Sequence, residues 1–232
     1  MSNGTSMTYA KAPAGVLNSI EYNIDTVIVT NGETDMQRFY WLNSTYLDLA
    51  KATNTTMQGS PETMVYDNCR TLIFPKGLES IGADALRGYC HNLRTLSLPE
   101  GITTVGLAAF YGCTYLTNLT LPSTLRSIDD SGFGLCAKVQ SISVRAQLPP
   151  VIDAKTFEGV DRKITLAVPA CSKALYVEAP YWQEFFNITE DSTGSDNTAA
   201  GDRGTVRKIV RNGQVLILRG GKTYTPMGIE VR

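Results

Sequence analysis

Apolar and polar positions along the chain repeat with a unit of about 23 residues. Prolines mark three successive copies at Pro75, Pro99 and Pro122, which are 24 and 23 residues apart. The apolar positions of each copy recur in the next one, and a fourth, less regular copy runs from 144 to 168. Because several apolar positions agree at once, the repeat predicts a repeated structural unit.

Each copy contains a three-residue segment with two apolar outer positions and a middle position that is mostly small or polar. These segments are 72–74, 96–98, 119–121, 142–144 and 166–168. Alternation with a period of two predicts a half-buried strand whose outer side chains point inward. A single copy cannot bury its apolar face, so the copies are expected to stack and their strands to form a parallel sheet. The proline after the segment has no N–H and is expected to end the strand.

A second segment of each copy has the pattern Ile-Gly-x-x-Ala-Leu or a close variant, as in 81–86 and 105–110. We expect a short helical turn there, on the wall opposite the sheet, which makes the predicted fold an α/β solenoid. Upstream, strands are predicted at 25–30 and 46–49, with an amphipathic helix at 36–42 between them.

These motifs resemble the BspA-like (treponemal-type) leucine-rich repeat family of Bacteroidetes. The pairs Ile81-Gly82, Ala109-Phe110 and Gly112-Cys113 carry the resemblance, which is specific over residues 70–145. It implies a right-handed superhelix with a parallel sheet on one face, spanning 25–189 with its caps and preceded by an N-terminal segment, 1–24. It also implies a non-enzymatic protein at a bacterial cell surface or in the extracellular medium, which recognises a protein or a polysaccharide.

Aromatic residues cluster near both ends of the predicted solenoid, at 39–41 and at 181–186. A terminal repeat exposes an apolar face unless another segment covers it, so both clusters are predicted to form caps. The alternative is an exposed aromatic platform for carbohydrate, which uses the same residue types.

The composition changes after the repeats. Residues 190–204 are mostly small or acidic and have no apolar period, which predicts a linker. Residues 205–232 alternate between apolar and polar, with turn signals at Asn212-Gly213 and Gly220-Gly221, and predict a small antiparallel β-meander. Residues 214–224 resemble the secretion-sorting tails of exported Bacteroidetes proteins.

Charge is divided unevenly along the chain, whose formal net charge is -1. Residues 1–205 hold 15 basic and 21 acidic residues, a net of -6, whereas residues 206–232 hold 6 and 1, a net of +5. Solvated faces of a small sheet account for the basic tail; the alternatives are docking of the tail to the acidic body and binding of an anionic partner. No apolar run of 18 residues is present, so no transmembrane helix is expected. The first 24 residues lack the apolar core of a signal peptide, so an export signal, if the protein has one, is expected to lie outside this sequence.

The composition also excludes several classes of function. With 43% hydrophobic and 19% charged residues the chain is globular, and it has no overall basic footprint for nucleic acid. Its single histidine, His91, makes multi-histidine metal sites impossible and a histidine-based triad unexpected. Five cysteines are too few for a disulfide scaffold in a chain of this length. We therefore expect no cofactor, no metal and no catalytic residue.

Cysteines can form a metal or redox site, but the position of these cysteines in the repeat indicates that they pack in the core. Cys90, Cys113 and Cys136 share one position of the repeat, which Val160 fills in the fourth copy. Stacked positions lie in a line, whereas a tetrahedral metal needs converging ligands. We therefore predict that these cysteines act as small core hydrophobes. His91, which follows Cys90, is predicted to be a solvated loop residue.

Two further motifs are also better explained by structure than by chemistry. Asp129-Asp130 begins where other copies carry a turn glycine, so a solvated turn is expected rather than a carboxylate pair with a function. Gly221-Lys222-Thr223 lacks the earlier glycine of a phosphate-binding loop and is followed by a turn rather than a helix.

The partner-binding surface is expected on the outward side of the parallel sheet, which a curved solenoid presents to its ligands. The middle positions of the strands form this outward column: Ile28, Asp48, Ile73, Ser97, Thr120, Ser143 and Ala167. Five of them, Asp48, Ile73, Ser97, Thr120 and Ser143, are the predicted partner contacts, with Tyr111 and Tyr115 near the turns as additional anchors. Few large anchor residues are present, so modest affinity is expected.

Two other functions stay open at this stage. A structural spacer or assembly subunit, with the tail mediating export or anchoring, would bind no soluble ligand. An enzyme would need convergent polar groups in a pocket, and the sequence contains no such constellation.

Overall fold

The computed structural model describes residues 6–9, 26–29, 45–59, 69–88, 90–191, 207–211, 214–219, 222–224 and 230–231. Side chains are described at 26, at 28 and within the ranges between 45 and 191. The chain divides into two compact units, 1–194 and 195–232, which are considered separately below. The predicted helix at 36–42 and the aromatic cluster at 39–41 lie outside the described residues.

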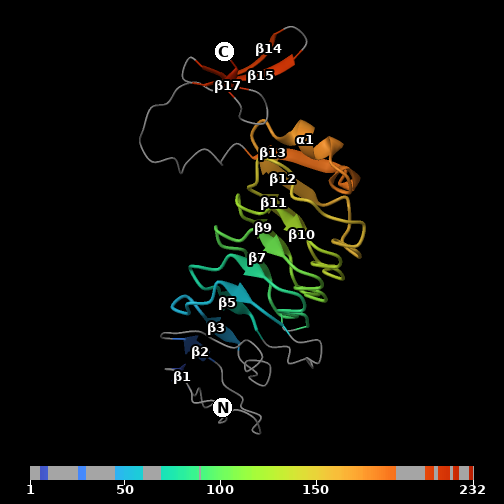
Figure 1. Cartoon of the computed structure of the whole chain (residues 1–232). Helices are drawn as coiled ribbons and strands as arrows, with labels where there is room; N and C mark the ends of the chain where they lie inside the picture. Colours follow the sequence, from blue (N-terminus) through green and yellow to red (C-terminus); the bar gives the residue numbers. More distant parts are fainter. Residues whose placement is uncertain are drawn as a thin grey trace. The chain divides into compact units, whose positions relative to one another are not determined.

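The first unit is a solenoid whose main wall consists of parallel strands from successive repeats (Figure 1). One sheet contains, in spatial order, β1 (Ser6–Tyr9), β2 (Thr26–Val29), β3 (Tyr46–Asp48) and β5 (Thr71–Ile73). The next sheet contains β7 (Thr95–Ser97), β9 (Asn118–Leu121), β11 (Ser141–Val144), β12 (Thr165–Pro169) and β13 (Asn187–Asp191). The predicted parallel sheet of the repeats is confirmed, with each strand one repeat further along the chain.

The opposite wall differs from the prediction. It contains a second parallel sheet of two-residue strands, namely β4 (Thr56–Met57), β6 (Ser80–Ile81), β8 (Thr104–Val105) and β10 (Ser127–Ile128). The segments that follow are turns, because Asp84, Ala108 and Ser131 have φ of 53°, 51° and 57°. A left-handed residue interrupts a right-handed helical run, so the expected helical turn does not form. The repeats are therefore a β-solenoid rather than an α/β one.

Helices occur, within the described part of the chain, only at the C-terminal end of the solenoid. They are α1 (Lys173–Glu178) and the 3-10 helix η2 (Trp182–Glu184). No helix there is long and apolar enough to cross a membrane.

The core consists of apolar positions that coincide from one coil to the next. On the main wall Leu119 pairs in register with Leu96 and with Ile142, and all three side chains are buried. On the opposite wall Ile81 and Ile128 flank Val105 in the same way. Each apolar side chain thus packs on its equivalents in neighbouring coils, as expected of a stack that buries one continuous core.

A row of aromatic rings runs through this core toward the C-terminal end. Phe110 and Phe133 stack with ring centroids 5.0 Å apart, and Phe133 and Phe157 stack at 5.7 Å. Phe157 then contacts the rings of Trp182 and Phe185 at 5.5 and 5.7 Å. The repeat core therefore continues directly into the aromatic residues that close it.

The predicted C-terminal cap is present for most of the aromatic cluster. Trp182 is buried and its Nε1 donates a hydrogen bond of 2.7 Å to the carbonyl oxygen of Pro150. The Tyr176 hydroxyl donates one of 2.8 Å to Ala146, and burial raises the pKa of Tyr176 above its ordinary value. Phe186 is the exception, because its side chain is 79% exposed and does not take part in the closure.

The second unit contains four short strands, β14 (Arg207–Arg211), β15 (Gln214–Arg219), β16 (Lys222–Tyr224) and β17 (Glu230–Val231). Each pairs with the next in antiparallel orientation, and Arg211 lies opposite Gln214 across the first turn.

One corner of the solenoid recurs with a left-handed backbone. Gly88, Gly112 and Gly159 occupy it with φ of 67°, 78° and 80°, whereas Leu135 adopts φ of 57° at the same corner of its own repeat. A left-handed conformation brings the Cβ of any residue other than glycine too close to the following carbonyl oxygen. Leu135 is therefore a strained position that its neighbouring coils hold in place.

We predict that Leu135→Gly is more stable than Leu135→Ala by about 1 kcal/mol, because only glycine removes the Cβ strain. Both variants lose the same leucine contacts, so their difference isolates the backbone effect. Urea unfolding followed by circular dichroism measures it, and equal midpoints for the two variants would contradict a left-handed conformation at this corner.

We predict that Phe133→Ala destabilises the solenoid by about 3–5 kcal/mol, because it leaves a cavity between two stacked rings. Phe133→Leu, the control, keeps most of the volume and is expected to cost less. Since coupling runs between neighbouring repeats, the alanine variant is also expected to split or broaden the denaturant transition. A single, unshifted transition would show that the ring row does not couple the coils.

Candidate functional site

The residues of the predicted outward column lie at aligned positions of neighbouring strands. The register places Thr120 beside both Ser97 and Ser143, and Ser143 beside Ala167. In the preceding sheet Asp48 lies between Ile28 and Ile73. The side chains of this column are exposed or half-buried, so the column is accessible along the wall.

The hydroxyl groups of Ser97, Thr120 and Ser143 form no hydrogen bond with other residues that the structure describes. They project from neighbouring strands, which are spaced by about 4.8 Å in a parallel sheet. This surface therefore presents a regular row of small groups able to donate and accept hydrogen bonds.

A second outward row runs beside the first, two residues earlier in each strand. It consists of Thr95, Asn118, Ser141, Thr165 and Asn187, which are paired in register. Its side chains bond to one another: Asn118 Nδ2 donates to Ser141 Oγ at 3.1 Å, and Asn187 Nδ2 donates to Thr165 Oγ1 at 3.0 Å. The sequence analysis missed this row, although the two-residue period that located the first row also marks it.

The two tyrosines predicted as anchors lie in different surroundings. Tyr115 is 42% exposed and carries the ammonium of Lys138 over its ring, 3.8 Å from the centroid. Tyr111 is half-buried, with the guanidinium of Arg87 5.0 Å from its ring centroid, and its ring would be 2.9 Å from a Cβ placed on Gly134. Tyr115 is therefore a surface residue, whereas Tyr111 packs against the next coil.

Tyr115 also lines a shallow cavity of about 210 Å³ together with Arg70, Asn92 and Arg94. Arg70 and Arg94 occupy the same position in successive repeats, immediately before β5 and β7. Backbone hydrogen bonds hold these turns together, since Tyr115 N donates to the carbonyl oxygen of His91 at 3.1 Å. The sequence analysis did not select either arginine, although their spacing of 24 residues marks them as repeat equivalents.

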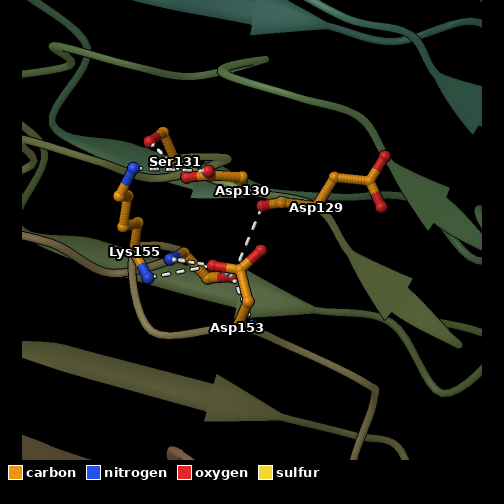
Figure 2. Close-up of polar contacts among 6 residues, drawn as sticks. Asp129, Asp130, Ser131, Asp153 and Lys155 are labelled. Atoms are coloured by element: carbon orange, nitrogen blue, oxygen red, sulfur yellow. Dashed lines mark hydrogen bonds and ion pairs between the residues drawn. The ribbon is translucent and has the colours of Figure 1, made fainter.

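The carboxylates near Asp129 serve the turns that carry them. Figure 2 shows the Asp129 carboxylate pointing away from those of Asp130 and Asp153. Asp130 accepts a hydrogen bond of 2.7 Å from the Ser131 hydroxyl and lies 3.8 Å from Lys155 Nζ. Asp153 Oδ1 accepts the backbone N–H of Lys155 at 2.9 Å. These contacts agree with the predicted turn.

The cysteines of the repeats are reduced and buried. Cys69, Cys90, Cys113 and Cys136 are at most 1% exposed, and all five cysteines of the chain are free thiols. Hydrogen bonding to the next thiol, together with burial, raises the pKa of Cys69 and Cys113 above the ordinary thiol value. Among the described residues, no group of three or more metal-ligating side chains is placed to hold an ion. The cysteines therefore pack as core residues, as their repeat position predicts.

His91 lies in a turn on the surface, half-buried, while the adjacent Cys90 side chain is inside the core. A cysteine nucleophile must be accessible and must face its base. The neighbouring pair in sequence is thus separated by the wall of the solenoid, and the predicted loop position of His91 is confirmed.

We predict that Cys113→Val changes stability by less than about 1.5 kcal/mol, because the swap nearly conserves volume in a packed core. Cys113→Asp is expected to unfold the central repeats, because it buries a carboxylate without a partner. Thermal unfolding of both variants measures the difference, and a large loss in the valine variant would indicate a role for the thiol beyond packing.

The stacked parallel strands, the in-register apolar columns and the accessible outward rows define a leucine-rich repeat solenoid. A family model described as a BspA type leucine-rich repeat region matches residues 37–171 in six copies. The chain belongs to this BspA-type leucine-rich repeat family. A comparison with curated proteins finds none that matches the chain. Such solenoids are typically non-enzymatic scaffolds for protein interaction.

Proposed function

We propose that this protein is a non-catalytic recognition module at a bacterial cell surface or in the extracellular medium. Its partner, a protein or a polysaccharide, binds along the outward rows of the parallel sheet. The observation that supports the proposal is the aligned column of Ser97, Thr120 and Ser143, whose hydroxyl groups are not used by the described part of the fold.

The small size of these side chains favours close approach of a partner to the sheet. Short hydroxyl side chains lose little rotamer entropy when they are bound, and they leave the surface without projections. Few large anchors are available, so the binding energy is spread over many modest contacts. A partner with a repeating structure suits such a surface, since the three coils that carry Ser97, Thr120 and Ser143 present similar groups.

We predict that Ser97→Gln/Thr120→Gln/Ser143→Gln abolishes ligand binding, because three longer side chains obstruct the face without changing its charge. The full chain is screened by surface plasmon resonance against extracellular-matrix proteins and polysaccharides. The control is Thr104→Gln/Leu107→Gln/Ala154→Gln, which places the same side chains at exposed positions away from the main sheet. A ligand that the first variant binds as tightly as the wild type would contradict the proposed face.

A second candidate function uses the C-terminal unit. Residues 206–232 carry a net charge of +5, in contrast to the acidic remainder, and 195–232 form a compact unit of their own. These observations favour a role of the tail in export or anchoring, with the solenoid as a spacer or assembly subunit. Deleting residues 205–232 would then release the protein from its location, and the full chain would bind no soluble ligand in the screen described above.

A further inference from the structure

We propose that the cavity lined by Arg70, Asn92, Arg94 and Tyr115 binds an anionic group, a carboxylate or a sulfate, carried by an acidic polysaccharide. This inference rests on the proposed function, because it names the ligand class that the main wall of the solenoid recognises. It adds a site that lies outside the outward rows, at the N-terminal ends of β5 and β7.

Two positively charged side chains, Arg70 and Arg94, line the cavity. Neither the Arg70 nor the Arg94 guanidinium forms an ion pair with a carboxylate of the described residues. The sequence from 101 to 128 contains no aspartate or glutamate, and neither does that from 86 to 99. Two guanidinium groups therefore line one cavity with no ion-pair partner among the residues that the structure describes, an arrangement that attracts an anion.

The side chains that line the cavity carry hydrogen-bond donors suited to an anionic group. A guanidinium presents several N–H donors in a planar fork that matches the two oxygens of a carboxylate or sulfate. Asn92 contributes an amide and Tyr115 a phenol, so donors of three kinds line the same space. The Lys138 ammonium, 3.8 Å from the centroid of the Tyr115 ring, adds a third positive charge beside the cavity.

The surroundings of the cavity favour a polysaccharide over an acidic peptide. Arg94 directly precedes Thr95, the first residue of the second outward row, so the cavity is continuous in sequence with a surface of hydroxyl and amide groups. Protein interfaces usually centre on a desolvated apolar patch, and these rows offer none between β7 and β11. Hydroxyl and amide groups instead match the many hydroxyls of a sugar chain.

The size of the cavity agrees with this class of ligand. Drug-sized molecules occupy pockets of about 300–1,000 Å³, so a cavity of 210 Å³ suits one charged sugar unit and not a larger folded group. The remaining sugars of the chain would then lie on the adjacent outward rows. Recognition therefore combines one charged anchor with a series of neutral contacts.

The experiment measures binding of the full chain to immobilised hyaluronate, which is a carboxylate polymer, and to dextran sulfate. Neutral dextran and poly-L-glutamate are the comparison polymers. We expect binding to at least one acidic polysaccharide, and Arg70→Gln/Arg94→Gln is expected to weaken it about tenfold or more. The control Lys76→Gln/Arg126→Gln removes two positive charges at exposed positions outside the cavity and is expected to change binding less than about twofold.

Four results would overturn the proposal. They are the absence of binding to both acidic polysaccharides, equal binding to neutral dextran, equal weakening by the control variant, and preferential binding of poly-L-glutamate through the same arginines. The last result would identify an acidic peptide as the ligand. Tyr115→Ala is expected to weaken polysaccharide binding, whereas Tyr115→Phe separates the contribution of the ring from that of the hydroxyl.

The same assay distinguishes failure of this inference from failure of the proposed function. If the glutamine variant of Ser97, Thr120 and Ser143 loses binding while Arg70→Gln/Arg94→Gln keeps it, the sheet face recognises the ligand and the cavity does not. If only the arginine variant loses binding, the anion site is real and the proposed face is wrong.

Discussion

The interaction on which the whole solenoid depends is the contact between one coil and the next. A single coil has neither a closed core nor partners for its backbone groups. At the corners, Phe110 N donates to the carbonyl oxygen of Gly132 and Gly112 N donates to that of Gly134, both at 2.8 Å. A buried backbone donor without a partner is costly, so each corner must repeat the geometry of its neighbour. This requirement places Leu135 in a left-handed conformation that glycine occupies in other coils.

The same constraint turns the sequence repeat into surface rows. Since equivalent residues stack in register, the same residue type at one position of successive repeats forms a continuous row along the wall. Phenylalanine at one core position gives the row of rings that ends at Trp182, and hydroxyl residues at one outward position give the column that includes Thr120. The core and the proposed recognition surface are therefore separated by position within the repeat, and substitutions in the outward rows are expected to leave the core largely intact.

The sequence could predict the features that the repeat determines directly. The parallel strands and the buried cysteines followed from aligned apolar positions, and the closure by Trp182 followed from the need to cover the apolar face of the last coil. The opposite wall could not be predicted in the same way, because the segment beginning at Ile81-Gly82 is equally compatible with a helical turn and with a two-residue strand followed by a corner. Two of the left-handed residues that decide between them, Ala108 and Ser131, have side chains that give no clear signal for that conformation. The cavity was missed for a related reason, because its lining comes from two different positions of the repeat. Asn92 and Tyr115 share one position, and Arg70 and Arg94 share the other. Only the geometry of the corner brings these two positions together.

The regular face and the charged cavity would place different demands on a ligand. The coils that contain β7, β9 and β11 offer similar small polar groups, so the proposed rows alone would bind a repeating partner in several registers. The proposed charged anchor would remove that degeneracy, because only one register would place an anionic group between Arg70 and Arg94. Charged contacts also speed encounter and weaken with salt, whereas hydroxyl contacts change little with ionic strength. The two contributions could therefore be separated by experiment. Added salt would weaken the contribution of the cavity, which selects the register, whereas a longer ligand would increase the contribution of the rows to the affinity.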